Sequence, residues 1–215
     1  MQSFYLLHRE PGFSRRPWTS IGVSDRFKSV RSGDEFDDVI LGRTFDMKLD
    51  FTMTCFNRGR LPDIPMCDGF MNVVSDRLHT ILKPYFGNGV QSREIVIENA
   101  VGIEAPYWIL SIEPGCGSCD HSQGSYLFFK KSMPENRDLE ISLEKAYGIF
   151  FDVNTWNGSS IFKMQDSGAR TIITSEVAEA VKRAGLVGVQ VTRLDRHGYE
   201  QWQQYQKTGK HPLLF

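Results

Sequence analysis

Residues 170–195 constrain the fold more than any other stretch, because strand, cap, helix, breaker and strand signals follow one another there in order. The β-branched run 171–173 predicts a strand, and Thr174 or Ser175 then caps a helix. Apolar residues recur in that helix at i, i+3, i+4 and i+7, namely Val177, Ala180, Val181 and Ala184. Two glycines end the helix before a second strand at 189–194. The stretch therefore predicts a β-α-β unit.

An earlier stretch, residues 71–98, repeats this pattern. Ser75 and Asp76 stand where the helix begins, and the apolar helix positions match those of the later unit at one constant offset. Pro84 predicts that this helix kinks or ends near Lys83, because proline removes a helical hydrogen bond. The two stretches look like one repeated building block. With far more strand than helix elsewhere, they predict an α+β fold that is strand-rich.

Further strands are expected outside the two units. Residues 45–56, FDMKLDFTMTCF, alternate between apolar and mostly polar residues and predict a half-buried strand. Residues 106–113, PYWILSIE, predict a buried strand that forms a hairpin with 126–129 across a long glycine-rich loop. A second hairpin is expected where 147–156 and 159–164 flank Asn157-Gly158.

We expect these elements to form one α+β domain over residues 1–215. Residues 1–70 are either part of that domain or a strand-rich N-terminal lobe before a core of residues 71–215. If the chain has two lobes, we therefore expect the boundary between them near residue 70.

Composition narrows the class of partner. The net charge is -1 and the sequence pI is about 6.5, so no overall basic field favours nucleic acid. No apolar run approaches the roughly 18 residues of a membrane span, and the first residues lack the apolar centre of a signal peptide. The four cysteines are too few and too unevenly placed for a secreted disulfide framework. We therefore expect a cytoplasmic protein with free thiols and a protein or small-molecule partner.

The most prominent candidate for chemistry is the loop that carries Cys116, Cys119 and His121. A C-x-x-C pair on a glycine-rich turn can hold zinc, but a structural zinc site needs further ligands and no second such pair exists in the sequence. A redox role is less favoured, because the motif lies between predicted strands and does not open a helix. Motifs for nucleophilic catalysis and phosphate binding are not found either. We therefore expect no catalytic residue and no cofactor.

One histidine lies inside a predicted element. His79 falls on the polar side of the first helix, and we expect its ring to be solvated there.

An acidic cluster before the strand at 45–56 is the candidate binding segment. Carboxylates around an aromatic ring suit a protein that occupies the cleft of a basic enzyme, because charge steers the encounter and the ring anchors it. The alternative is an ordinary solvated turn. The residues of the cluster are Asp34, Glu35, Phe36, Asp37 and Asp38.

The two units and the strand after the first resemble the eleventh immunity-protein family of bacterial polymorphic toxin systems, formerly a domain of unknown function. The segments that carry the resemblance are VVSDRLHTIL with the strand around residues 94–98, YWILSIE, and IFKMQDSGARTIITSEVAEAVKRAGLVGVQVTRL. They cover roughly residues 70–195. The matching positions are core and cap positions, so the resemblance transfers no binding residue.

The resemblance implies a cytoplasmic protein that binds and neutralises a cognate secreted or contact-delivered toxin, often a nuclease, without turnover. In that case the acidic cluster becomes the candidate toxin-binding segment. Two alternatives stay open: a small metal-assisted or thiol-dependent enzyme that uses Cys116, Cys119 and His121, and a non-enzymatic adaptor.

Overall fold

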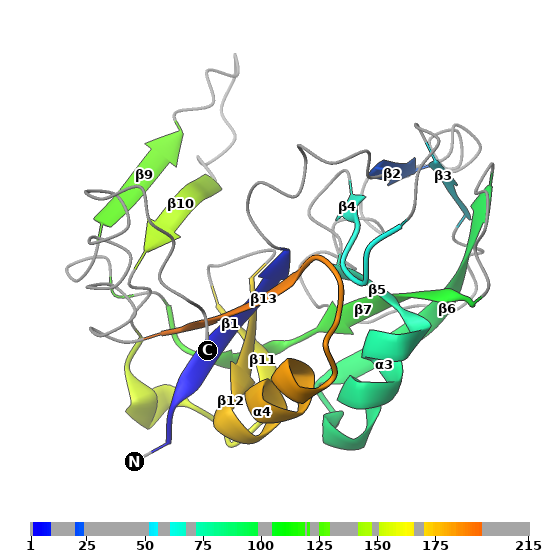
Figure 1. Ribbon diagram of the computed structural model, residues 1–215. Helices are drawn as coiled ribbons and strands as arrows, with labels where there is room; N and C mark the ends of the chain where they lie inside the picture. Colours follow the sequence, from blue (N-terminus) through cyan, green and yellow to red (C-terminus); the bar gives the residue numbers. More distant parts are fainter. Residues whose placement is uncertain are drawn as a thin grey trace.

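The computed structural model of the chain is a strand-rich α+β fold, as predicted (Figure 1). The residues that the structure describes are 2–9, 20–23, 52–55, 61–67, 72–98, 105–118, 120, 125–129, 142–147, 151–165 and 170–194. The helical elements are α3 (Asp76–Leu82), η3 (Lys83–Tyr85), η4 (Val153–Thr155) and α4 (Ser175–Arg183), where η marks a 3-10 turn. The strands are β1 (Phe4–Arg9), β2 (Ser20–Val23), β3 (Thr52–Cys55), β4 (Met66–Cys67), β5 (Asn72–Ser75), β6 (Val90–Glu98), β7 (Tyr107–Ile112), β8 (Pro114–Cys116), β9 (Ser125–Phe129), β10 (Ser142–Tyr147), β11 (Ile161–Met164), β12 (Thr171–Thr174) and β13 (Val189–Arg193).

Two large sheets contain most of these strands. A five-stranded sheet has the order β13-β1-β12-β11-β8, and a six-stranded sheet has the order β4-β2-β3-β6-β7-β5. β9 and β10 form a separate antiparallel pair. Only Glu113 separates β7 from β8, so one continuous stretch of chain contributes a strand to each large sheet. The first 70 residues also supply strands to both sheets, because β1 pairs with β12 and β13 whereas β3 pairs with β6.

Each predicted β-α-β unit holds a third strand between its two parallel strands. In the first unit, β7 lies between β5 and β6 and is antiparallel to both. In the second unit, β1 lies between β12 and β13 and is antiparallel to both. The first unit therefore consists of β5, α3, β6 and β7, and the second of β12, α4, β13 and β1, whose inner strand comes from the far N-terminal end of the described chain.

The two units are equivalent in register. β12 begins 99 positions after β5, and β13 begins the same 99 positions after β6. Tyr107 of β7 faces Ser75, and Phe4 of β1 faces the equivalent Thr174. The same correspondence continues along both inner strands. The four-residue sequences YWIL in β7 and FYLL in β1 also match in residue type. These agreements point to an internal duplication.

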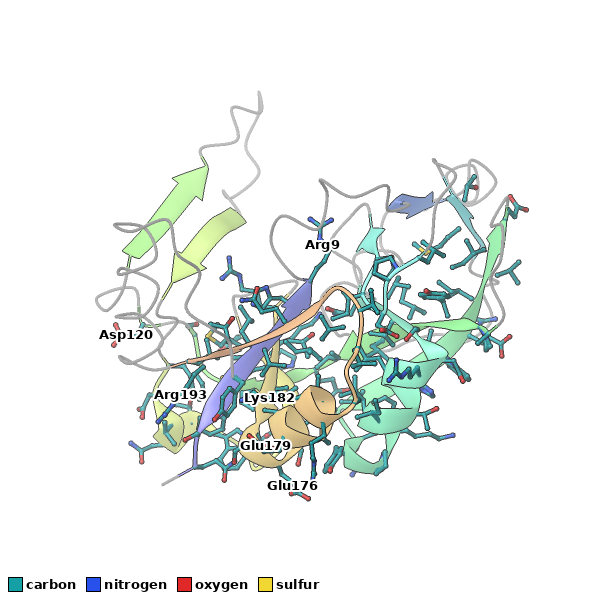
Figure 2. All side chains as sticks on the ribbon, viewed as in Figure 1. Arg9, Asp120, Glu176, Glu179, Lys182 and Arg193 are labelled. Atoms are coloured by element: carbon teal, nitrogen blue, oxygen red, sulfur yellow. The ribbon has the colours of Figure 1, made fainter. Side chains whose placement is uncertain are left out.

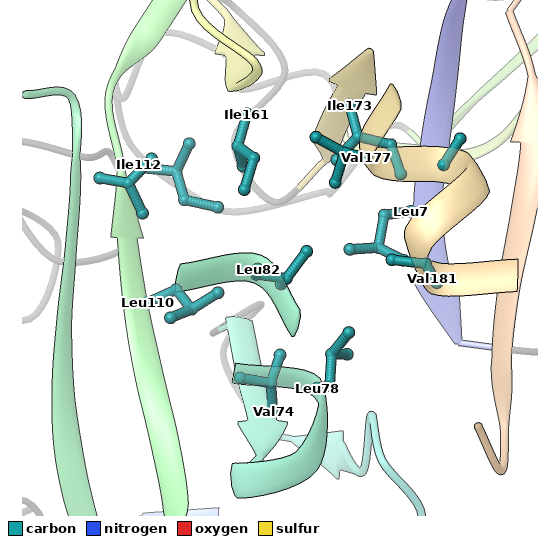
Figure 3. Close-up of a cluster of buried hydrophobic side chains, with 12 residues drawn as sticks. Leu7, Val74, Leu78, Leu82, Leu110, Ile112, Ile161, Ile173, Val177 and Val181 are labelled. Carbon is teal, nitrogen blue, oxygen red and sulfur yellow. The ribbon is translucent and has the colours of Figure 1, made fainter. Parts of the chain in front are cut away.

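The paired helices and both sheets share one apolar core (Figure 3). α3 and α4 pack against each other. Leu82 of α3 is fully buried and belongs to the same cluster as Ile173 of β12 and Ile112 of β7. Polar contacts support this join: Thr171 Oγ1 donates to Asn72 Oδ1 at 3.1 Å, and Arg77 donates to the carbonyl oxygen of Ala184. The units therefore pack as one body around a common interior.

The helix ends follow the sequence signals. Ser75 caps α3, and its hydroxyl accepts a hydrogen bond from the backbone N–H of Leu78 at 3.2 Å. α3 ends at Leu82 and Pro84 lies in the following 3-10 turn, which confirms the predicted break near Lys83. α4 is followed by Gly185, whose φ of 58° is the left-handed conformation that glycine adopts at the end of a helix. Within the parts of the chain that the structure describes, no helix has the length and apolar character needed to cross a membrane.

Two predicted hairpins are wrong. The strand expected at 106–113 is present as β7, but both its edges are taken by β5 and β6, and β9 pairs with β10 instead. β11 is also present, but its edges are taken by β12 and β8. Before the turn at Asn157-Gly158, Asp152 Oδ1 accepts a hydrogen bond from Asn154 N–H at 2.9 Å and caps η4. Such local side-chain caps compete with strand pairing.

Candidate binding surface on β6 and β7

The predicted acidic cluster falls outside the described residues. Asp34, Glu35, Phe36, Asp37 and Asp38 all lie in the range 24–51, about which the structure gives no description. Their proposed contact with a toxin therefore stays a prediction.

Of the predicted cysteine loop, the structure describes Cys116. Its side chain is 7% exposed and packs beneath β11 with Phe162 and Phe4. Its Sγ lies 3.8 Å from the carbonyl oxygen of Lys163. Cys119 and His121 lie outside the described residues. Among the described residues, no three His, Cys, Asp or Glu side chains are grouped so that they could hold a metal ion. Cys116 thus behaves as a small apolar core residue.

A polar and aromatic cluster joins α3 to β6 and β7 in the first unit. The rings of His79 and Trp108 stack with centroids 4.0 Å apart and planes at 4°. The indole Nε1 of Trp108 donates to Asp76 Oδ1 at 2.9 Å. His79 Nε2 lies 2.9 Å from Ser92 Oγ, and the ring contacts Phe86 edge-on. These contacts hold the half-buried Trp108 side chain in one orientation on the helix-covered face of the sheet.

The predicted solvation of His79 is wrong, because its side chain is only 3% exposed. The pKa of His79 is lowered from its usual value of 6.5, mainly because burial disfavours the imidazolium. The charge of Lys83 lowers the pKa further, whereas Asp76 acts in the opposite direction. The ring is therefore neutral at pH 7.

His79 and Ser92 have the atoms of a base and a nucleophile, but their surroundings point to a positioning role. The imidazole is buried between Trp108, Phe86 and the sheet, so a substrate has no approach to it. The carboxylate of Asp76 is directed at the indole. We assign the histidine to supporting Trp108, because buried polar groups of this kind fix the side chains they contact.

Beyond α3, one face of β6 is open. From residue 94 onward the strand alternates, with Glu94, Val96 and Glu98 exposed and Ile95 buried. Val96 is 64% exposed, which makes it the most exposed large apolar side chain among the described residues. Glu94 directly faces Trp108 across the sheet, so the exposed side chains lie on the same face as the indole. We call Glu94, Val96 and Glu98 the β6 strip.

The second unit differs from the first at this place. Applying the register of the duplication, the counterparts of Asp76, His79, Ser92, Glu94 and Trp108 are Ser175, Ala178, Val191, Arg193 and Tyr5. β13 ends at Arg193, whereas β6 continues to Glu98 and pairs there with β3. Lys182 Nζ lies 4.9 Å from the centre of the Tyr5 ring. Figure 2 shows Lys182 on α4. Among the residues described in both units, the combination of Asp76, Glu94 and Trp108 is therefore specific to the first unit.

The sequence analysis missed this surface. Residues 95–97 are apolar without interruption, so the pattern does not show which side of the strand is open. The signal that was available is the similarity of YWIL to FYLL, which would have aligned Trp108 with Tyr5 and revealed the divergence around it.

A scan against protein-family models finds no match to the chain, and a search of the curated proteins finds none either.

Proposed function

We propose that this protein is an immunity protein, which binds a cognate bacterial toxin and neutralises it by stoichiometric occlusion. Two kinds of support bear on the proposal. The segments that carry the sequence resemblance are those that form the two units, and the first unit presents an open surface of carboxylates and apolar side chains.

The observation that carries the proposal is the exposure of Val96 between two carboxylates on a strand whose opposite face is buried. Met53 and Ile95, on that opposite face, are 2% and 4% exposed, so the strip is part of a packed sheet. A surface that is already fixed loses little conformational freedom when a partner binds. The arrangement therefore suits tight binding without turnover.

A producing cell would need such an inhibitor where its toxin could act, so we place the protein in the cytoplasm. Cys116 gives no support to the thiol-dependent alternative, because a substrate cannot reach a sulfur atom within an apolar cluster.

Co-expression with the product of the neighbouring gene tests the proposal. If the neighbouring product stops growth when expressed alone, the present protein should restore growth, and the two should co-purify in a fixed ratio. A growth arrest that persists, together with the lack of a complex between the purified proteins, would contradict the proposed function.

A further inference from the structure

We infer that the β6 strip, flanked by Trp108, is the contact surface for the basic, nucleic-acid-binding face of a nuclease toxin. This inference rests on the proposed function and names the partner chemistry and the surface that recognises it. Four features of the strip support this assignment: its exposure, its charge, its backbone pairing and the difference in sequence from the second unit.

Exposure gives the strip an apolar centre. Val96 projects from the middle of the three-residue strip and is 64% exposed, although valine in a strand normally packs against a neighbouring layer. Trp108 lies beside Glu94 and is held by Asp76 and His79, so it adds a fixed aromatic edge. Apolar and aromatic side chains that are anchored in this way are the residue types that dominate binding energy at interfaces.

Charge selects the partner. Glu94 and Glu98 are both exposed on the same face, four residues apart, which places them about 13 Å from each other along the strand. Asp76 adds a third carboxylate beside the indole. A partner that offers lysines and arginines around an apolar spot complements this arrangement. Nucleases carry such basic surfaces because they must bind phosphates, and carboxylates placed there would both steer the encounter and block the nucleic acid.

Backbone pairing fixes the strip within the sheet. β6 pairs with β7 over residues 90–95 and with β3 over residues 96–98, so each residue of the strip pairs with a neighbouring strand along one edge of β6. The side chains of Glu94, Val96 and Glu98 are exposed on one face of that strand. A folded partner can therefore contact the strip through its own side chains.

The duplication supplies an internal comparison. The counterpart of Glu94 in the second unit is Arg193, and β13 ends there. The positions that correspond to Val96 and Glu98 are Asp195 and His197, which lie outside the described residues. Over the residues described in both units, the second unit keeps the same register with Arg193 in place of Glu94, so packing of the unit does not require that carboxylate.

The probe is the product of the neighbouring gene, provided that it stops growth when expressed alone, in a catalytically inactivated form. Its affinity would be measured for the full-length protein and for two variants, Val96→Asp and the double variant Glu94→Lys/Glu98→Lys. The matched control is Glu176→Lys/Glu179→Lys, which changes the charge by the same amount at exposed positions of α4 (Figure 2). The contact between Glu179 and Lys182, at 3.7 Å, is an exposed pair whose loss should matter little.

We expect each strip variant to raise Kd at least about 10-fold and the control to change it less than about twofold. Far-UV circular dichroism verifies that each variant is folded. If Val96→Asp fails to fold, the isosteric Val96→Thr serves in its place and should raise Kd by roughly threefold.

The possible failures are distinguishable. If the wild-type protein binds and neither the strip variants nor the α4 control weaken binding, the strip is not the contact surface, although the proposed function stands. If the strip variants and the control weaken binding equally, the attraction is a property of net charge and the inference is wrong. If the wild-type protein neither binds the probe nor restores growth, the proposed function itself is overturned.

Discussion

Replacing Leu82 by alanine should lower the free energy of unfolding by about 3–5 kcal/mol. Leu82 is fully buried in the cluster that both units share. The substitution removes three carbon atoms, which corresponds to about 2.4 kcal/mol at 0.8 kcal/mol for each methylene-sized group. The cavity left among side chains of α4, β7 and β12 raises this cost, because packed surroundings relax only partly. The equivalent Val181→Ala removes two carbon atoms and should cost about 2–3 kcal/mol.

Urea denaturation would give the loss of free energy, and native-state amide hydrogen exchange would show where protection is lost. Because the core is continuous across the units, Leu82→Ala should lower the protection of β5 and of β12 by similar amounts. A loss of less than about 1 kcal/mol, or a loss of protection confined to the first unit, would refute the description of the two units as one folding body.

Two further predictions concern the five-stranded sheet, which contains β1 and β8. His8 is partly buried beside Thr192, with Nε2 2.9 Å from the hydroxyl. The pKa of His8 is lowered from 6.5 to about 4, mainly because burial disfavours the imidazolium; a backbone hydrogen bond at Arg9 acts in the opposite direction, and the charge of Arg170 contributes to the lowering. The unfolded chain therefore binds the proton first, so stability contributed by neutral His8 is complete above pH 6.5 and falls as the pH drops toward 4. The full shift in pKa would correspond to about 3 kcal/mol of the free energy of unfolding, and residual solvent contact keeps the loss below that value. Denaturation curves should show that His8→Gln loses less stability at acid pH than the wild-type protein does. An identical loss in the two proteins would contradict this account. Gly115→Ala would place a Cβ atom 2.5 Å from the Cβ of Phe162 and should lower the free energy of unfolding by about 1–3 kcal/mol. In the control Gly87→Ala, the new Cβ atom meets no atom within 4 Å. Equal thermal midpoints for the two variants would count against the close approach of β8 and β11.

The elements that the sequence predicted are those specified by neighbouring residues. The Ser75 cap of α3 and the apolar spacing of α3 and α4 depend on residues within a few turns of chain, and Pro84 acts on its own helix. Thr174 occupies the N-cap position of α4, but its side chain makes no capping hydrogen bond. The constant offset of the two units also survives in the structure, because duplicated segments keep their local signals even where their surfaces diverge.

The elements that the sequence did not predict depend on distant pairing. β1 joins the second unit from more than 160 positions away, and no local pattern indicates that FYLL lies between β12 and β13. The same limitation explains why the burial of His79 was not predicted. Its position in the helix pattern is on the polar side, and the ring that covers it belongs to Trp108 of β7. The hairpin predictions failed because β5 and β6 occupy the edges of β7, and β12 and β8 occupy the edges of β11, so the expected partners had no free edge to pair with.

The divergence between the units connects fold and function. One copy ends its strand at Arg193 and places Lys182 over Tyr5, while the other extends its strand and surrounds Trp108 with carboxylates. In the proposed function, one copy contributes mainly packing and the other provides the surface for the partner. The proposal therefore depends on Asp76, Glu94 and Trp108, whose counterparts in the second unit are Ser175, Arg193 and Tyr5.

Methyl NMR of the valine side chains, recorded while the inactivated toxin domain is added, tests the central claim most directly. Val96 and Val153 provide a matched pair, because their side chains are 64% and 51% exposed and lie on different parts of the molecule. The account predicts that the signals of Val96 shift or broaden in proportion to the bound fraction while those of Val153 stay unchanged. Binding that perturbs Val153 and leaves Val96 unaffected would contradict it.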